Sequence, residues 1–279
     1  MPLHVEVRGA GPPLALLHGF TQTGRLWGRF GERMTESHTL IAVDLPGHGG
    51  SDAVRADLPE AAALVAEAIR ATVGRDDEDL PGGCALLGYS LGARVALHVL
   101  TGTDLAVSRV VLIGATGGIE ETAERERRRL ADVALADQLE DSGDVERFID
   151  DWLRGPMFAR LSSSEDAERA ERLRNSASGL ASSLRLCGTG TQVPLWDRLE
   201  QVPCPLLALA GTDDVRFAAH AQRLASTAPR AVASLVPGGG HAVHLAQPHQ
   251  TWRIVHHWLG AESPQVMGGG TSPDDGSPA

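Results

Sequence analysis

The sequence contains no lysine, so all 25 of its basic residues are arginine. It also has 36 acidic residues, which gives a formal net charge of −11. A chain with no excess of basic residues lacks the positive surface that nucleic-acid-binding proteins use. We therefore expect no nucleic-acid partner. We also attach no special meaning to an arginine merely because it replaces a lysine.

Cysteines and long apolar runs are also scarce. Cys84, Cys187 and Cys204 lie far apart and match no metal-binding or redox spacing, so we expect reduced thiols. No apolar run is long enough to span a membrane. The N-terminal stretch MPLHVEVRGAGPP lacks the charged and apolar regions of a signal peptide. These absences predict a cytoplasmic protein.

Short apolar runs predict the strands of a central sheet. Continuous apolar character is typical of parallel strands buried on both faces. Helical patterns separate several of the runs, which indicates an α/β fold with a mostly parallel sheet flanked by helices. We expect strands at 14–18, 40–43, 84–87, 110–113, 206–210 and 231–236, and helices at 59–73, 91–100, 217–228 and 248–259.

Residues 114–204 break this alternation, because they contain helix-like patterns and no buried-strand run. Helices inserted after a strand can form a lid over an active site. We therefore expect a core formed by 1–113 and 205–260, with 114–204 as a helical lid. Residues 261–279 are rich in Gly, Pro, Ser and Asp, which predicts a disordered tail.

The stretch Gly88-Tyr-Ser-Leu-Gly92 follows a predicted strand and opens a predicted helix. A G-x-S-x-G sequence alone is a weak signal. In this context it matches a nucleophile elbow, in which the glycines permit a strained turn that exposes the serine hydroxyl. We therefore take Ser90 as the candidate catalytic serine.

Two later loops offer the acid and the histidine that such a serine needs. GTDDVRF contains Asp213 and Asp214, and the Gly-x-x-Asp spacing favours Asp214. GGGHAVHL contains His241 and His244, and the glycines favour His241 because they let the loop bring it over the serine. The order Ser, Asp, His is the one expected for the α/β-hydrolase fold.

The backbone N–H groups of Phe20 and Leu91 are the expected donors of an oxyanion hole. Phe20 lies in the run LHGF after a predicted strand, and Leu91 directly follows the serine. His18 and His48 also lie in loops, where we expect structural rather than catalytic roles.

Arg94 occupies an unusual position, in the first turn of the helix that follows Ser90. A cation there faces the positive end of the helix dipole, which costs about 0.3–1 kcal/mol. It is also four residues after Ser90, so the two side chains lie on one helix face. Helix stability therefore does not explain this arginine.

The chain to about residue 259 resembles the α/β-hydrolase superfamily. Within it, the chain is most similar to the 2-succinyl-6-hydroxy-2,4-cyclohexadiene-1-carboxylate synthases, lyases of menaquinone biosynthesis. The discriminating motifs lie outside the triad and largely in the variable lid: GYSLGAR, ERERRRLAD with LADQLE, DWLRGPMFARL, RLRN with GLASSLRLCGTG, and LWDRL. The sequence departs from the family at Thr116-Gly117-Gly118, where Ser-Pro-Gly is common, and at Ala93, where Gly is common.

The resemblance implies that pyruvate is eliminated from 2-succinyl-5-enolpyruvyl-6-hydroxy-3-cyclohexene-1-carboxylate, with no cofactor and no metal. Ser90, activated by His241 and oriented through Asp214, would remove a ring proton beside the succinyl ketone. The amides of Phe20 and Leu91 would bind the developing enolate oxygen.

The resemblance also implies a polycarboxylate partner, which accounts for Arg94, because arginine donates charge-assisted hydrogen bonds to carboxylates. Alternatives stay open in the lid. Arg128 lies in a charged run typical of a solvated helix face, and Arg125 takes its place if the match slips by one turn. The implied substrate-binding residues are Tyr89, Arg94, Arg128, Trp152 and Arg174, of which Trp152 can equally be a core anchor.

Two other functions fit part of this pattern. A serine carboxylesterase uses the same triad, but an ester substrate does not explain Arg94 and an arginine-bearing lid. A ligand receptor with this fold does not need an intact triad. Epoxide hydrolases and dehalogenases are disfavoured because they use Asp as nucleophile, and epoxide hydrolases add lid tyrosines, whereas Tyr89 is the only tyrosine here. The sequence leaves the oligomeric state open.

Overall fold

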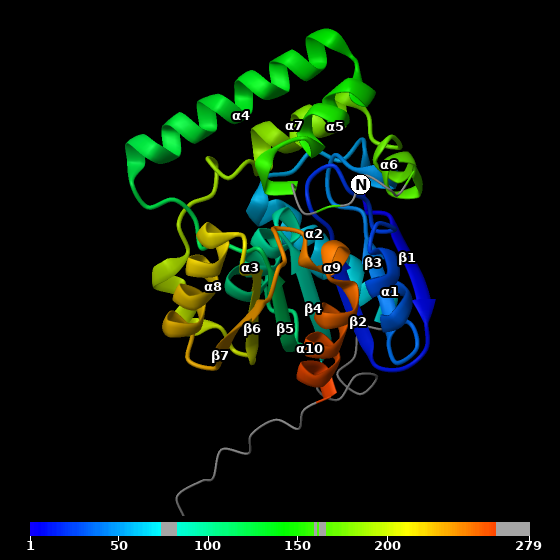
Figure 1. Cartoon of the computed structure of the whole chain (residues 1–279), viewed down its shortest axis with the longest axis vertical. Coiled ribbons are helices and arrows are strands. Elements are labelled where there is room, and N and C mark those ends of the chain that lie inside the picture. Colours follow the sequence, from blue (N-terminus) through cyan, green and yellow to red (C-terminus); the bar gives the residue numbers. More distant parts are fainter. Residues whose placement is uncertain (74–82, 159–160, 162–165, 261–279) are drawn as a thin grey trace, which may run out of the picture.

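The computed structural model describes residues 1–73, 83–158, 161 and 166–260. These residues form a seven-stranded sheet with helices on both faces (Figure 1). Its strands are β1 (Val5–Gly9), β2 (Pro13–Leu17), β3 (Thr39–Val43), β4 (Cys84–Tyr89), β5 (Val107–Ile113), β6 (Leu206–Gly211) and β7 (Ala231–Val236).

The strand order is β1-β3-β2-β4-β5-β6-β7. β1 pairs with β3 in antiparallel fashion, and the other neighbours in the described sheet pair in parallel. The predicted α/β fold with a mostly parallel sheet is confirmed. β1 was not predicted, because its sequence VEVRG forms a largely exposed edge strand rather than a buried apolar run.

Two layers of helices cover the sheet. Leu14 and Leu16 of β2 pack into one core, whereas Ala15 and Leu17 pack into the other, so both faces are buried. This double burial explains why the strands are continuous apolar runs. One layer contains α2 (Leu58–Val73), α3 (Leu91–Gly102) and α8 (Val215–Thr227), and the other contains α1 (Gly28–Met34), α9 (Val243–Ala246) and α10 (Pro248–Gly260).

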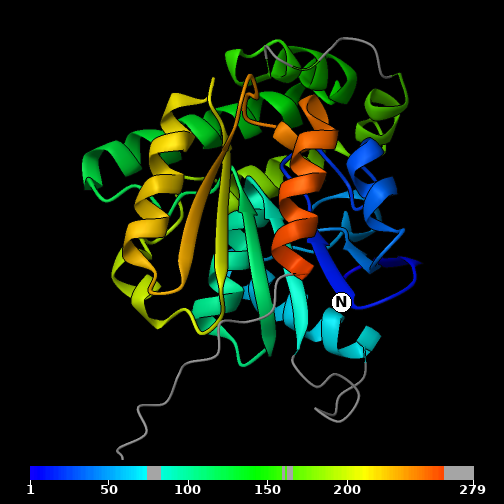
Figure 2. The same ribbon diagram turned by 60° about the horizontal axis from the view of Figure 1, so that its bottom comes forward.

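The segment between β5 and β6, here called the helical insertion (residues 114–204), contains helices and no strand in its described part. Figures 1 and 2 show α4, α5 and α7 gathered across one end of the sheet. The insertion comprises α4 (Thr122–Ser142), α5 (Val145–Leu153), α6 (Asp166–Arg172) and α7 (Ala177–Cys187), with short 3-10 turns at Pro156–Phe158 and Trp196–Gln201. A further 3-10 turn, at Gly49–Ser51, lies in the core between β3 and α2.

Helix α7 was not predicted, because ASGLASSLRLC contains glycine and four serine or cysteine residues that favour other structures. It forms because the Ser176 hydroxyl caps it, accepting the Gly179 N–H at 3.0 Å. Ala181 and Leu184 then pack against Ala136 of α4. Tertiary packing thus outweighs local preference here.

The thiols of Cys84, Cys187 and Cys204 are free and buried. In the part of the chain that the structure describes, no helix has the length and apolar character needed to cross a membrane. The predicted disordered tail at 261–279 lies outside the described residues.

Candidate active site

Ser90 stands at the turn between β4 and α3, with backbone angles φ 51° and ψ −104°. The flanking glycines are required by close backbone contacts. A Cβ on Gly88 would lie 2.5 Å from the Gly92 carbonyl oxygen, and a Cβ on Gly92 would lie 2.0 Å from the Leu17 carbonyl oxygen. The G-x-S-x-G motif therefore has a steric cause, which is the tight crossing of strand and helix.

Three predicted side chains meet at this turn. His241 Nε2 lies 3.0 Å from Ser90 Oγ, and His241 Nδ1 lies 2.8 Å from Asp214 Oδ2. An ionised carboxylate can only accept, so Nδ1–H donates to Asp214 and Nε2 is left to accept the serine proton. This geometry can raise the basicity of Ser90 when a substrate is bound.

The alternative acid and histidine lie elsewhere. The Asp214 carboxylate caps α8, accepting the Phe217 N–H at 3.3 Å, which fixes its direction. Asp213 instead accepts a hydrogen bond from the Thr212 hydroxyl. His244 is buried against Tyr89, with ring centroids 4.4 Å apart, and burial lowers its pKa to about 3. His244 is therefore neutral and does not contact Ser90.

Glycines also make room for the His241 ring, which is almost completely buried. A Cβ on Gly114 would lie 2.8 Å from His241 Cε1, and Gly114 has a positive φ of 60°. The Phe217 ring packs on the other side, with its centroid 4.4 Å from that of the imidazole. The loop GGGH, which carries His241, therefore lies against Gly114, the residue that follows β5.

Phe20 and Leu91 line the same cavity as Ser90 and His241. Neither of their backbone N–H groups is paired with a protein acceptor among the described residues, as donors awaiting an oxyanion must be. Thr21 and Ser90 are the only non-glycine residues with positive φ in the described chain. One follows Phe20 and the other precedes Leu91.

His18 and His48 hold the loops beneath this cavity. His18 Nε2 accepts the Leu45 N–H at 3.0 Å, and its Nδ1–H donates to the Gly19 carbonyl at 2.8 Å. Burial lowers the pKa of His18 to about 4 and that of His48 to about 3. Both rings are neutral packing elements, in line with the structural role expected of them.

Arg94 is buried and lines the cavity with Ser90. Its Nη1 donates to the Cys187 carbonyl oxygen at 2.7 Å, which uses part of the guanidinium. Burial lowers the pKa of Arg94 to about 10, so the group is still charged at neutral pH. Its other N–H groups have no acceptor in the described chain and are available to a ligand.

Arg128 and Trp152 reach the cavity from the helical insertion. Arg128 Nε donates to Asp132 Oδ1 at 2.9 Å, so its charge is already paired. The Trp152 ring packs edge-on against Phe20, with centroids 5.1 Å apart. The alternative Arg125 instead donates to the Ile119 carbonyl at 2.9 Å and does not line the cavity.

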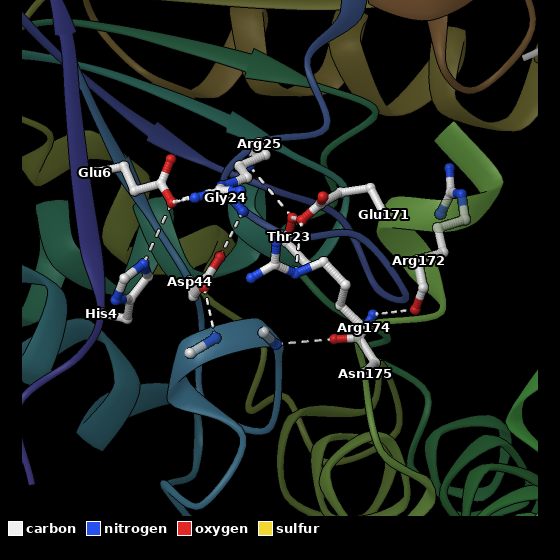
Figure 3. A network of polar contacts seen from close by, with 12 residues as sticks. His4, Glu6, Thr23, Gly24, Arg25, Asp44, Glu171, Arg172, Arg174 and Asn175 are labelled. Atoms are coloured by element: carbon white, nitrogen blue, oxygen red, sulfur yellow. Dashed lines mark hydrogen bonds and ion pairs between the residues drawn. The ribbon is translucent and has the colours of Figure 1, made fainter. Parts of the chain in front are cut away.

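Tyr89 and Arg174 are not among the residues that line this cavity. Tyr89 lies behind it with its ring 5.4 Å from that of His241, and burial raises its pKa. Arg174 is half exposed, with Nε 3.5 Å from Glu171 Oε1 (Figure 3). Arg174 follows α6 and lies outside the lining of this cavity, so its contact with substrate stays a prediction.

Arg172, two residues earlier, is the buried arginine of this segment. Its Nη1 donates to Thr21 Oγ1 at 2.6 Å, and burial lowers its pKa. Like Arg174, it does not line the Ser90 cavity, and its contact is with the loop of Thr21.

Asn175 connects the helical insertion to two loops of the core (Figure 3). Its Nδ2 donates to the Thr21 carbonyl at 2.9 Å, and its Oδ1 accepts the Gly49 N–H at 3.0 Å. Asp44 links the same two loops, because its carboxylate accepts the Gly24 and Gly50 N–H groups at 2.6 and 2.7 Å. The loop of Phe20 and Thr21 is thus held from both sides.

Arg216 also lines the cavity and was not predicted. It is the second residue of α8, two residues after the capping Asp214. The available signal was its place in GTDDVRF, two residues after the candidate acid.

The family assignment rests on most of the chain. The sequence model described as "Alpha/beta hydrolase family" matches residues 14–254, which contain all three members of the triad. The chain belongs to this family.

Relatives within the alpha/beta hydrolase family are more specific. A Bacillus subtilis protein is 34% identical over 264 residues, covering 91% of this chain and 92% of its own length. The 2-succinyl-6-hydroxy-2,4-cyclohexadiene-1-carboxylate synthase of Serratia proteamaculans is 33% identical, over 85% of this chain and 89% of its own. MenH from S. aureus has a similar structure, with a TM-score of 0.83 and 30% identity over 92% of this chain and 97% of its own. The resemblance to these synthases is confirmed.

Proposed function

We propose that this chain is a lyase of menaquinone biosynthesis. It eliminates pyruvate from 2-succinyl-5-enolpyruvyl-6-hydroxy-3-cyclohexene-1-carboxylate to give 2-succinyl-6-hydroxy-2,4-cyclohexadiene-1-carboxylate. The observation that carries this function is a serine–histidine pair, with Oγ and Nε2 3.0 Å apart, in a cavity that arginines also line. The relative from Serratia proteamaculans, named for the same product, supports the choice of substrate.

In the proposed reaction, Ser90 passes its proton to His241 Nε2 as it removes the ring proton from C2, beside the succinyl ketone. The C2–H electron pair first moves onto the ketone as an enolate. As the enolate collapses, C2=C3 forms, the C3=C4 pair moves to C4=C5, and the C5–O bond breaks. The leaving enolpyruvate takes up the proton held by His241 and rearranges to pyruvate. Asp214 stabilises the transient imidazolium.

The amides of Phe20 and Leu91 bind the ketone oxygen while it carries enolate charge. Arg94 binds a substrate carboxylate, and Arg128 and Trp152 complete the wall from the insertion. Tyr89 supports His241 from behind. No step requires a metal or a cofactor.

We propose further that residues 114–204 act as a lid over a core formed by 1–113 and 205–260. The cavity at Ser90 has a volume of about 80 Å³. Ligand pockets usually have volumes of about 300–1,000 Å³, so the Ser90 cavity is too small for the proposed substrate until the insertion moves away. The working location would be the cytoplasm, with a small polycarboxylate as partner.

The test is direct. Purified protein is mixed with the enolpyruvyl substrate, and pyruvate is measured by coupling to lactate dehydrogenase and following NADH. The Ser90→Ala variant is the matched control. Rapid cleavage of simple aryl esters with no pyruvate release would favour a carboxylesterase and reject the lyase.

A further inference from the structure

The positive charge in the Ser90 cavity comes from three arginines on different helices. Arg94 is on α3, Arg128 on α4 and Arg216 on α8. Two nearby carboxylates, Asp132 in the described lining and Asp214 outside it, are already engaged. Asp132 accepts a hydrogen bond from Arg128, and the carboxylate of Asp214 binds His241.

Arg216 differs from the other two arginines. Its side chain is exposed and makes no ion pair or hydrogen bond with any other residue of the described chain. Arg223, on the same helix, shows what an engaged arginine looks like here: it pairs with Glu120 at 2.5 Å and lies over the Trp196 ring at 3.8 Å. Arg216 is therefore an uncompensated cation on the wall of a catalytic cavity.

The place of Arg216 in the chain fixes it close to the reacting atoms. Asp214, which caps α8, holds His241, and Phe217 packs its ring against that imidazole. Arg216 lies between these two residues, so its backbone is held by the same contacts that position the base. A substrate anion bound by Arg216 would be anchored relative to Ser90 and His241.

We propose that Arg216 binds a carboxylate of the substrate from the α8 wall of the cavity, whereas Arg128 lines the cavity from α4. Arg216 thereby helps the site to select polyanions. This inference rests on the proposed function, since a polycarboxylate is the substrate class concerned. An exposed cation also raises the local concentration of anions near the cavity, an effect that salt screens. Arg94 and Arg216 then hold separate carboxylates of one molecule.

The experiment measures binding separately from turnover. The probe is 2-(3-carboxypropanoyl)benzoate, which carries an aryl ketone and two carboxylates, so that one carboxylate is left for Arg216 when Arg94 holds the other. Its uncharged partner is 1-phenylbutan-1-one. Dissociation constants are measured by calorimetry for the unaltered protein, Arg216→Ala, Arg216→Lys and Arg230→Ala. Arg230 is an exposed arginine outside the cavity whose Nη1 donates to the Pro203 carbonyl at 3.5 Å, so its removal changes net charge equally.

Arg216→Ala should weaken binding of the carboxylate probe about tenfold or more, the loss of one charge-assisted hydrogen bond. Binding of the uncharged ketone should not change. Arg216→Lys should recover part of the affinity, and Arg230→Ala should match the unaltered protein. With the true substrate, KM should rise more than kcat falls.

Equal effects of Arg216→Ala on the charged and the uncharged probe would overturn the assignment. So would a probe affinity that Arg216→Ala leaves unchanged, or the absence of measurable binding to the unaltered protein. Failure of the proposed function looks different. In that case the charged probe still binds through Arg216, but no pyruvate is released.

Discussion

Arg94 Nη1 donates a hydrogen bond of 2.7 Å to the carbonyl oxygen of Cys187, and thereby joins the helix that begins after Ser90 to the end of α7. This contact gives one buried cation two tasks. It offers charge to the cavity, and it fastens the helical insertion to the core. A helix position that is unfavourable by itself is therefore explained by tertiary contacts.

Arg94→Ala should reduce both activity and stability. Loss of a buried charged partner costs about 2–5 kcal/mol. At about 1.4 kcal/mol per decade, kcat/KM for pyruvate release should fall by roughly one and a half to three and a half decades. The Cys187 carbonyl also loses its donor, so the thermal midpoint should drop.

Arg185→Ala is the matched control for Arg94. Arg185 joins α7 to α4 through Asp137 and Glu140 and does not line the cavity. Its removal should leave kcat/KM within a few-fold of the unaltered value. Unchanged kcat/KM in Arg94→Ala would show that this arginine is only a structural link.

The triad should behave as a single unit. Ser90→Ala and His241→Ala should each remove most pyruvate release, and the double variant should be little worse than either, because members of one catalytic unit are not additive. The comparison needs steady-state rates of all three variants. Nearly normal turnover by Ser90→Ala would eliminate the serine as the base.

A serine that acts as a base should leave no covalent intermediate. Protein quenched with acid during turnover should show only its unmodified mass by mass spectrometry. A nucleophilic serine would instead give a mass increase that disappears in Ser90→Ala. Detection of such an adduct with the enolpyruvyl substrate would contradict the proposed elimination.

Truncation of Arg172 should destabilise the protein much more than truncation of Arg174. Arg172 is buried and bonded to Thr21, so Arg172→Ala should lower the free energy of unfolding by about 1.5–3 kcal/mol. Its loss should also lower kcat, since Thr21 follows Phe20. Arg174 makes an exposed pair, and Arg174→Ala should change stability by less than about 0.5 kcal/mol. Denaturant titrations of both variants test this contrast, and equal losses would reject it.

Buried histidines should make stability depend on pH. Burial lowers the pKa of His18 to about 4, and the pKa values of His48 and His244 to about 3, from 6.5. The unfolded chain therefore binds more protons, so this contribution is fully present above pH 6.5 and is lost as the pH falls toward 4. Each histidine contributes a slope of up to about 1.4 kcal/mol per pH unit.

The test is the free energy of unfolding measured between pH 7 and pH 5, above the range in which most carboxylates titrate. His244→Phe keeps the ring packing against Tyr89 and removes one titrating group. Its slope should be shallower than that of the unaltered protein. Identical slopes would mean that His244 does not contribute to this dependence.

The sequence predicted the parallel strands because burial on both faces leaves a strong apolar signal, as in β2 and β4. It did not predict β1, whose edge position leaves Val7 exposed, or α1, whose sequence GRFGERM contains two glycines. These elements depend on contacts with distant parts of the chain, such as the packing of Phe30 in the core that also contains Leu14 and Leu16 of β2.

Ser90, Asp214 and His241 could be located because each follows a strand whose end was recognisable. The residues of the insertion were harder, since only the structure shows where α6 ends and that Arg172 is buried. For Arg216 the sequence offered only its place two residues after Asp214, and the structure shows that it lines the cavity.

The two left-handed residues, Thr21 and Ser90, have a consequence for protein engineering. Each such conformation in a non-glycine residue costs on the order of 1–3 kcal/mol, and both adjoin the amides of Phe20 and Leu91. Glycine at position 21 would relieve that cost, and a screen for heat resistance would favour it wherever the gain exceeds the hydrogen bond lost to Arg172. The same change would loosen the neighbouring Phe20 donor, so thermostability gained there would be exchanged for reaction rate. At position 90 glycine would remove the catalytic hydroxyl itself, so the strain at Ser90 cannot be relieved in this way.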